Sequence, residues 1–303
     1  MRIAFGEALL ELGVEVEDLV VLTADVAKPT QAAVFRDRYP QRFLNIGISE
    51  QDMVDIAAGL ALNEKVPVVV AFAPFLMRGW EQIRSTISRC NLNVKLVGTH
   101  AGLSASDEGA SHQPLEDVAL MRVLPNMTVV VPGDREEVKE ATEAIVRKDG
   151  PVYMRIGRDE EERFLDEEFR LGRAVVLKDG CDVAVFSNGF LTREVLEAAK
   201  EAQVDAMVVH VPTVKPLDAE TVVSAAKKAG AVLCVEEHSI IGGLGSAVAE
   251  LLSSEYPVYT RRMGVADTFG ESGTYRELLD KHHLSAPHIK KAIEETAGRR
   301  GMR

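Results

Sequence analysis

Two histidines on either side of a polar loop have the spacing of a site for a hydroxylated substrate. His100 follows an apolar run at 94–98, and His112 stands 12 positions later. The loop between them, GLSASDEGAS, is rich in glycine and serine and contains Asp107 and Glu108. A lone histidine is usually structural, whereas a pair that flanks a flexible polar loop after a strand is typical of a substrate site. The residues alone leave both interpretations open.

A carboxylate and two aromatic rings accompany other apolar runs. Glu50, in NIGISEQDM, comes just before a strongly apolar helical stretch. Its plain interpretation is an acid in the first turn of a helix, where the helix dipole favours it. Phe72 and Phe75, in VVVAFAPFLMR, stand at the carboxyl end of a buried strand, where open α/β sheets bind ligands. Only 5% of the residues are aromatic, so two rings here favour binding; core packing is the alternative, above all for Phe75.

Other ligand-binding motifs are missing from the sequence. No H-x-x-H or H-E-x-x-H spacing exists, so we expect no metal site built by this chain alone. There is also no P-loop and no G-x-G-x-x-G. We interpret the GGLG run at 242–245 as a structural glycine turn before a helix. His238, shortly before it, is interpreted as a surface histidine in a loop, the alternative being a position near a cofactor entrance.

The elements that position these residues alternate between short apolar runs and longer helical patterns. Buried β-branched runs separated by helices predict mostly parallel sheets covered on both faces. The predicted strands are 19–23, 67–72, 94–98, 128–131, 151–155, 183–186, 206–211, 231–235 and 258–259. The predicted helices are 51–62, 81–90, 136–147, 192–202 and 245–252. The expected fold class is therefore α/β, with two consecutive three-layer domains.

A charged segment separates the two series of elements. Residues 159–173 are crowded with Asp, Glu and Arg and lack a sustained apolar period. We interpret this segment as a linker, the alternative being a surface helix within one domain. The expected division is a first domain at 1–160, a linker at 161–174 and a second domain at 175–303.

Composition narrows the classes of function. The chain has 303 residues and a net charge of −12, which argues against a nucleic-acid partner. No apolar run approaches the roughly 18–20 residues that a membrane helix needs, so we expect no membrane partner. The three cysteines, Cys90, Cys181 and Cys234, have no paired spacing, which indicates a reducing cytoplasm.

Four stretches, taken together, resemble the transketolase family. NIGISEQDMVDIAAGLAL, VVVAFAPFLMRGWEQIR and THAGLSASDEGASHQPLEDVALMRVLPNMTVVVPGD are similar to the family's pyrimidine-binding domain. FGESGTYRELL resembles its C-terminal domain. The resemblance covers nearly the whole chain in order, and the HQPLED run with its two histidines is highly specific. It implies the transketolase fold and thiamine diphosphate as cofactor.

The resemblance also implies roles for single residues in cofactor binding. Glu50 matches the glutamate that hydrogen-bonds N1′ of the aminopyrimidine and so promotes loss of the C2 proton of the cofactor. Phe72 matches the aromatic residue that stacks on the pyrimidine, and Phe75 stands in place of a nearby pocket ring. Asp25, in TADVA, matches an aspartate near the thiazolium.

The same resemblance implies which residues bind the substrate. His100 and His112 match histidines that bind sugar hydroxyls and help proton transfer. Arg158 resembles the arginine that binds the sugar phosphate, a role suited to a forked guanidinium, and Arg2 matches a second phosphate arginine. Glu108 replaces the aspartate that usually precedes glycine in this loop and reads the donor hydroxyl, which leaves the sugar preference open.

One part of the family's cofactor site is missing from this sequence. The GDG…N stretch that holds the diphosphate through Mg²⁺ or Ca²⁺ does not occur. The resemblance therefore implies the C-terminal subunit of a split transketolase, which moves a two-carbon ketol unit between sugar phosphates. An N-terminal partner chain would hold the metal in an α2β2 assembly. The alternatives are the β subunit of a 2-oxo acid dehydrogenase, a 1-deoxyxylulose-5-phosphate synthase-like enzyme, and a non-enzymatic interaction protein.

Overall fold

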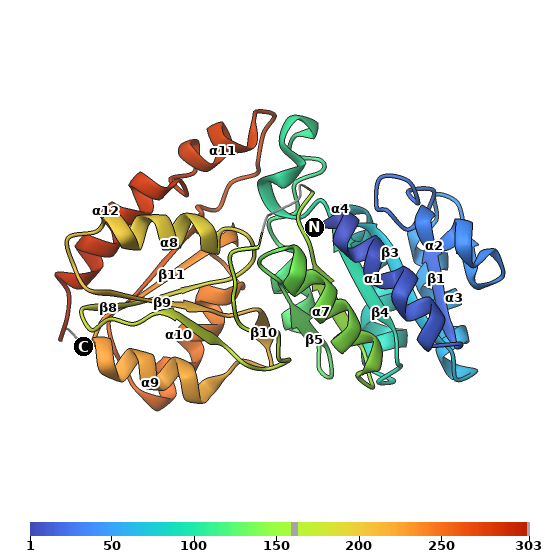
Figure 1. The fold of residues 1–303 in the computed structure, drawn as a ribbon, viewed down its shortest axis with the longest axis horizontal. Coiled ribbons are helices and arrows are strands. Elements are labelled where there is room, and N and C mark those ends of the chain that lie inside the picture. Colours follow the sequence, from blue (N-terminus) through green and yellow to red (C-terminus); the bar gives the residue numbers. More distant parts are fainter. Residues whose placement is uncertain (159–162, 302–303) are drawn as a thin grey trace.

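The computed structural model describes residues 1–158 and 163–301 and consists of two α/β units side by side (Figure 1). Each unit is a mostly parallel sheet with helices packed on both faces. The predicted fold class, two consecutive three-layer domains, is confirmed. Among the described residues, no helix combines the length and the apolar character that crossing a bilayer requires.

The first sheet has seven strands in the order β10-β5-β6-β4-β3-β1-β2. All of its pairings are parallel except that of β10 with β5. The central strands are rich in valine and leucine, as expected for strands buried on both faces. The bounds are β1 (Leu19–Thr23), β2 (Phe43–Asn45), β3 (Val66–Phe72), β4 (Lys95–Thr99), β5 (Thr128–Val130), β6 (Val152–Arg155) and β10 (Thr213–Lys215).

Helices cover the two faces of this sheet with separate apolar cores. α1, α2 and α7 pack on one face, and α3, α6 and the π-helical η3 pack on the other. The helical elements are α1 (Arg2–Glu15), α2 (Ala33–Arg38), η1 (Pro40–Arg42), α3 (Glu50–Leu62), α4 (Ala73–Leu76), η2 (Met77–Gly79), α5 (Trp80–Gln82), η3 (Ile83–Ser88), η4 (Gly102–Glu108), α6 (Asp117–Arg122) and α7 (Arg135–Arg147).

The second sheet has five strands in the order β12-β11-β8-β9-β7, of which only β7 runs antiparallel to its neighbour. α8, α11 and α12 cover one face, and α9 and α10 cover the other. The bounds are β7 (Val175–Lys178), β8 (Val183–Ser187), α8 (Thr192–Glu201), β9 (Ala206–His210), α9 (Ala219–Ala229), β11 (Val232–Ser239), α10 (Leu244–Glu255), β12 (Thr260–Val265), α11 (Tyr275–Lys281) and α12 (Ala286–Ala297).

The sequence-based expectation omitted several elements, namely β2, β7, β10, α1, α2, α6, α9, α11 and α12, and described two others differently. β10 was not predicted, because its three residues form a strand only by pairing with β5 of the other unit. The last strand lies at Thr260–Val265 rather than 258–259. It is an edge strand that carries arginines, and it therefore lacks a continuous apolar run. The helix expected at 81–90 is a short α-helix followed by the π-helix η3.

The segment between the units can be described only from residue 163 onward. Residues 159–162, where the expected linker begins, lie outside the described residues. Residues 163–174 form neither helix nor strand. They pack on the first unit, since the backbone N–H groups of Phe164 and Leu165 donate to Asp134 Oδ2 and that of Phe169 donates to Glu140. The domain division at 161–174 stays a prediction.

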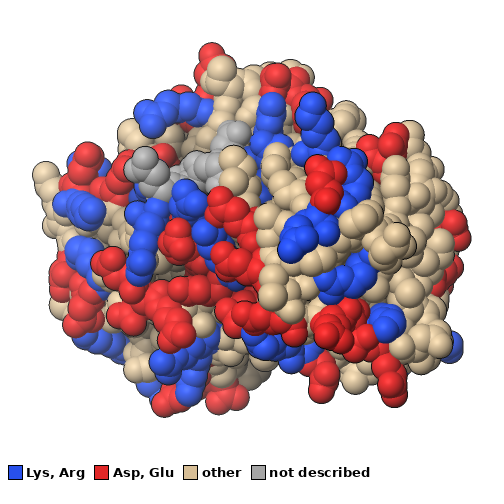
Figure 2. All heavy atoms as spheres, turned by 45° about the vertical axis from the view of Figure 1, so that its right-hand side comes forward, with Lys and Arg blue, Asp and Glu red and all other residues tan. Residues whose placement is uncertain are grey.

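The surface carries charges of both signs. Figure 2 shows Asp and Glu intermixed with Lys and Arg on one face, with acidic side chains predominating across its lower half. Exposed charges also pair across helices, as Lys139 and Arg135 of α7 do with Glu7 of α1. Such exposed pairs contribute little to stability. This face fits the acidic balance of the sequence.

Candidate active site

Four of the residues singled out in the sequence form one aromatic cluster. Phe72 ends β3, and Phe75 lies in the short helix α4 that follows; their rings stack with centroids 5.1 Å apart. His100 directly follows the neighbouring strand β4 and packs on Phe72 at 3.7 Å. His112 contacts the Phe75 ring edge-on at 5.1 Å. The carboxyl ends of adjacent parallel strands thus place these side chains at one edge of the sheet.

Glu50 reaches this cluster through an arginine. It is the first residue of α3 and is only 5% exposed. Within residues 1–158 and 163–301, its side chain has one polar partner, Arg78, whose Nη1 lies 3.5 Å from Glu50 Oε1. The Arg78 guanidinium also lies over the Phe75 ring, 5.1 Å from its centroid. A buried carboxylate with a single long contact has hydrogen-bonding capacity left for a ligand.

Sequence reasoning gave Arg78 no role. The available signal was its spacing, three residues after Phe75, which puts both side chains on the same side of a helical turn. Glu50 is also an acid in the first turn of α3, as its plain interpretation predicted, although Ser49 makes no side-chain cap of this helix.

His100 is a buried, neutral histidine. Its backbone adopts a left-handed φ of 55°, and its ring is 2% exposed. Nδ1 lies 2.9 Å from Thr99 Oγ1, and Nε2 lies 3.4 Å from Arg2 Nη1. Because the guanidinium can only donate, Nε2 accepts and Nδ1 carries the proton. Burial, reinforced by Arg2, Arg158 and His112, lowers the pKa of His100 to about 3.

We expect the His100 ring to show no ionisation between pH 5 and pH 9. The folded pKa is lowered because burial and the nearby cations penalise the imidazolium, so the ring gains a proton only near pH 3. Nitrogen-15 NMR of the imidazole measures this directly, with Nδ1 protonated and Nε2 not. Arg2→Met removes one cation and should raise the midpoint. A His100 midpoint above pH 5 in the parent chain would show that the assignment is wrong.

The two arginines assigned to an anionic substrate lie next to His100. Arg158 Nη1 donates to Asp107 Oδ1 at 2.9 Å and to Ala105 O at 3.4 Å. Arg2 donates from Nε to the carbonyl of Arg158 and from Nη1 to Pro29 O at 2.7 Å. The Arg158 hydrogen bond holds the pKa of Asp107 below its usual range. Glu108 is exposed at the end of η4.

Asp25 lies at the same edge of the sheet, beyond the end of β1. It is exposed and has a left-handed φ of 59°. Its backbone N–H donates to Asn45 Oδ1 at 2.9 Å, and Asn45 Nδ2 lies 3.4 Å from Asp25 Oδ1. These contacts tie Asp25 to the NIGIS stretch before Glu50 and do not link it to the aromatic cluster.

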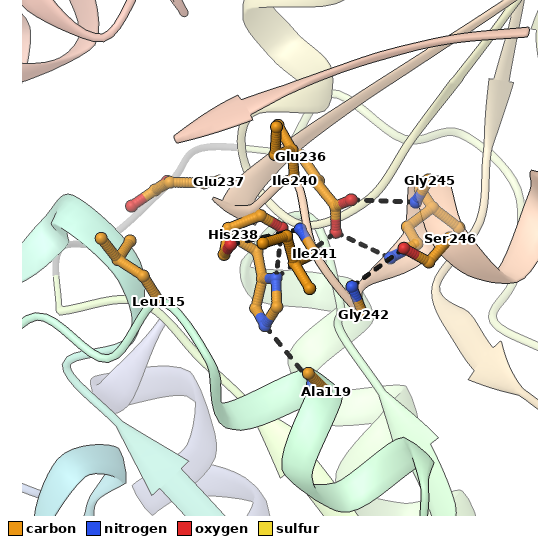
Figure 3. A network of polar contacts seen from close by, with 12 residues as sticks. Leu115, Ala119, Glu236, Glu237, His238, Ile240, Ile241, Gly242, Gly245 and Ser246 are labelled. Atoms are coloured by element: carbon orange, nitrogen blue, oxygen red, sulfur yellow. Dashed lines mark hydrogen bonds and ion pairs between the residues drawn. The ribbon is translucent and has the colours of Figure 1, made fainter. Parts of the chain in front are cut away.

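His238 is not the surface histidine expected from the sequence. It is 1% exposed and lies between the two units (Figure 3). Nδ1 donates to Ser239 O at 2.7 Å, and Nε2 accepts from the Ala119 N–H of α6 at 3.3 Å. The sequence pattern predicted a strand that ends at residue 235. Because β11 instead continues to Ser239, His238 lies within the strand and is buried.

The GGLG run is structural, as expected. Glu236 accepts the N–H groups of Leu244 and Gly245 at 2.7 and 2.9 Å, so its carboxylate occupies the amino end of α10 (Figure 3). A Cβ on Gly243 would lie 1.9 Å from Glu236 Oε2. Since the protein's own carboxylate satisfies these donors, this helix end is no free anion site.

Two models of known protein families match this chain, and together they cover most of its length. The family model described as "Transketolase, pyrimidine binding domain" matches residues 1–162, and "Transketolase, C-terminal domain" matches residues 172–289. The chain belongs to the transketolase family. The resemblance stated from the sequence motifs is thereby confirmed.

Relatives of similar length are transketolase chains. A protein of Methanocaldococcus jannaschii named as a transketolase C-terminal section is 41% identical, with 97% of this chain and 95% of that protein covered. A 6-deoxy-6-sulfo-D-fructose transketolase subunit of a Clostridium species is 38% identical, with 100% and 96% covered. A solved structure titled "Split gene transketolase, inactive beta4 tetramer" superposes with a TM-score of 0.90 at 43% identity, covering 99% of this chain and 98% of that one.

Proposed function

We propose that this chain is the C-terminal subunit of a split transketolase. It would transfer a two-carbon ketol unit from a ketose phosphate to an aldose phosphate with thiamine diphosphate, together with a second chain. The observation that carries the proposal is the single cluster formed by Glu50, Phe72, Phe75, His100 and His112. Two relatives of nearly the same length, one named as a transketolase C-terminal section and one as a split-gene transketolase, support it.

The residues present fit one half of the cofactor. Stacked apolar rings and a buried carboxylate suit a flat aminopyrimidine, which offers a face and a ring nitrogen. Phe72, Phe75 and Glu50 would hold it, with Asp25 toward the thiazolium. Among the residues that the structure describes, no group of three or more His, Cys, Asp or Glu side chains could hold a metal ion. The donor set therefore fits the pyrimidine, and Mg²⁺ or Ca²⁺ with the diphosphate is assigned mainly to the partner chain.

Each residue of the cluster has a distinct task. When bound, thiamine diphosphate supplies a carbanion-stabilising heterocycle. Glu50 would hold a proton at the ring nitrogen, and its burial would exclude water from that contact. Neutral His100 would offer Nε2 to a sugar hydroxyl in place of its 3.4 Å contact with Arg2, without adding charge. His112, which is partly exposed, lies where a substrate enters and moves protons at the sugar oxygens.

Arg158 and Arg2 bind the anionic tail of the sugar in this proposal. The guanidinium of Arg158 is partly exposed and pairs with Asp107, an exposed carboxylate that an incoming anion displaces. The names of relatives include a sulfonated fructose and apulose 4-phosphate, which share a negative group at the end of the sugar. An arginine fork binds sulfonate or phosphate oxygens in the same manner. Glu108, at the end of η4, is proposed to recognise the arrangement of the sugar hydroxyls.

A partner chain with the GDG…N stretch completes the site in an α2β2 assembly. We place the assembly in the cytoplasm, because Cys90, Cys181 and Cys234 are free thiols. The 1-deoxyxylulose-5-phosphate synthases are related as well, at lower identity than the split transketolases.

Reconstitution tests the proposal. The chain is mixed with a partner that contains GDG…N, thiamine diphosphate and Mg²⁺, and is given xylulose 5-phosphate and ribose 5-phosphate. We expect sedoheptulose 7-phosphate, measured by mass spectrometry, from the mixture. Turnover of pyruvate or a branched 2-oxo acid without any sugar transfer would instead identify a dehydrogenase β subunit.

His112→Ala should weaken sugar turnover while leaving cofactor activation intact. The His112 ring packs edge-on against Phe75, whereas Glu50 contacts Arg78. The variant therefore removes a proposed proton-transfer group and leaves the carboxylate in place. We expect kcat/KM for sugars to fall by about 100-fold, as for loss of a general acid or base. Hydrogen–deuterium exchange at C2 of the bound cofactor is the control. A parallel loss of exchange would contradict the separation of roles.

A further inference from the structure

A buried carboxylate of the second unit contacts the segment that carries both candidate histidines. We call residues 100–112 the histidine loop. Glu237 lies in β11 and is 3% exposed. Its Oε1 accepts a hydrogen bond from the Leu103 N–H of the loop, and its Oε2 accepts from the Tyr275 hydroxyl at 2.8 Å. Tyr275 is the first residue of α11, which lies beside η4 (Figure 1).

The chain just after the histidine loop is held at the same place. Arg155 Nη2 donates to Glu237 O at 2.8 Å and to Pro114 O at 3.4 Å. Its Nε donates to the Asp117 carboxylate, which also accepts the Tyr153 hydroxyl at 2.6 Å. Arg155 and Asp117 are at most 5% exposed. Both ends of the loop are thus fixed relative to β11 by buried, charged groups.

The FGESG run of the second unit makes a further contact with the loop. Gln113 Nε2 donates to Ser106 O at 3.0 Å inside the loop and to Glu271 O at 2.9 Å outside it. A Cβ on Gly109 would lie 2.6 Å from Ser272 Oγ, so the loop backbone approaches this run closely. The run singled out in the sequence therefore packs against the loop that carries His112.

The loop backbone needs such support. His100 and Ser106 have φ values of 55° and 49°, a left-handed region that L-residues other than glycine rarely adopt. Gly102 is also left-handed, and a Cβ there would lie 2.4 Å from Glu237 Oε1. Strained residues of this kind persist only where the surroundings determine their conformation. At the start of the loop, the second unit supplies the carboxylate of Glu237 directly, and Tyr275 holds that carboxylate through its hydroxyl.

We propose that Glu237 and Tyr275 are positioning residues, which hold the histidine loop so that His100 and His112 face the substrate. The second unit then contributes to the substrate site by positioning this loop. This inference rests on the proposed transketolase function for its kinetic consequences, and on the contacts of the chain itself for the order of the loop.

The charge of Glu237 gives the arrangement a pH dependence. Burial raises the pKa of Glu237 to about 7, against the opposing effects of Arg155, Tyr275 and the loop N–H groups that face it. Figure 3 shows its side chain pointing away from Glu236 and His238, so those groups do not face it. The carboxylate offers acceptors to both Leu103 and Tyr275, and protonation removes one of them. The hold on the loop therefore weakens as the pH falls through about 7.

Hydrogen exchange of the intact chain tests the contact without any cofactor. We compare Tyr275→Phe and Glu237→Gln with two control variants in the same unit, Tyr259→Phe and Glu255→Gln, the second at the exposed end of α10. In the first two variants, amides of residues 101–112 should exchange at least about tenfold faster at pH 8, while α12 keeps the parent rates. The controls should keep the parent rates in the loop. Unchanged loop exchange in both test variants would overturn the proposal.

Kinetics of the reconstituted complex test the consequence for the substrate site. Tyr275→Phe and Glu237→Gln should lower kcat/KM for sugars by about 10–100-fold, as expected from a small misplacement of catalytic groups. C2 exchange of the bound cofactor should stay within about twofold. Glu237→Gln should also lose the part of the pH profile with a midpoint near 7, which both controls retain.

The two experiments separate this inference from the proposed function. If the parent complex lacks transketolase activity, the proposed function fails, and hydrogen exchange still decides whether Glu237 and Tyr275 hold the loop. If the parent is active and the test variants loosen the loop but keep kcat/KM and the parent pH profile, the positioning role is refuted. Faster exchange together with the kinetic loss establishes it.

Discussion

Glu50→Gln should abolish most of the cofactor activation while leaving the fold unchanged. Glutamine has nearly the same size but cannot share a proton with a ring nitrogen as the carboxylate does. Among the residues that the structure describes, the long contact with Arg78 is the only polar contact that Glu50 would lose. We expect hydrogen–deuterium exchange at C2 of thiamine diphosphate, bound in the complex with the partner chain, to slow by about 100-fold or more. This is the range found for a positioned acid or base.

Asp52→Asn is the matched control for this experiment. Asp52 is an acid in the same first turn of α3, but it is exposed. Its variant should exchange at the parent rate. Circular dichroism and sedimentation should show that both variants fold and assemble like the parent. If Glu50→Gln exchanges at the parent rate, the assignment of Glu50 is wrong.

Asp117→Asn should cost about 3–5 kcal/mol of stability, the usual effect of removing one partner from a buried ion pair. Asp117 is fully buried and accepts hydrogen bonds from Arg155 and Tyr153. The uncharged amide would leave the guanidinium of Arg155 without a counter-charge in the protein interior. For a domain of this size, we expect the melting temperature to fall by roughly 10 °C.

The comparison variants for Asp117 are Tyr153→Phe and Asp18→Asn. Tyr153→Phe removes one hydrogen bond to a charged group and should cost about 1.5–3 kcal/mol. Asp18→Asn breaks a surface pair with Lys65, in which both side chains are about half exposed, and should leave the melting temperature nearly unchanged. Equal melting temperatures for Asp117→Asn and Asp18→Asn would contradict the role of the buried network.

Most of the fold could be predicted from the sequence, because buried parallel strands leave continuous apolar runs. β3 and β8 were found for this reason. The predictions omitted β2, β7 and the helices α1, α9 and α12, and the errors at β10 and β12 lie where tertiary contacts decide. β10 is a strand only because it pairs with β5 across the two units, and β12 carries Arg261 and Arg262 at an exposed edge. Neither feature has a local hydrophobic signal.

The candidate site was predictable where residues follow strand ends in one sheet. Phe72 and His100 meet because β3 and β4 are adjacent, a relation that the α/β pattern implies. The residues that hold the histidine loop were not predictable in the same way. Arg155 and Glu237 are 82 positions apart, and only the folded chain brings them together. The one signal was the pair of glutamates within the apolar strand VLCVEEHS, where charge is costly unless it is satisfied.

Cofactor binding by the separate chains tests the central division of labour most directly. Titration calorimetry with thiamine diphosphate and Mg²⁺ is performed on this chain alone and on its mixture with a partner that carries GDG…N. We expect the mixture to bind the cofactor and the lone chain to bind it at least about 100-fold more weakly, a difference of about 2.7 kcal/mol. Tight binding by the lone chain, with unaided conversion of sugar phosphates, would contradict this account.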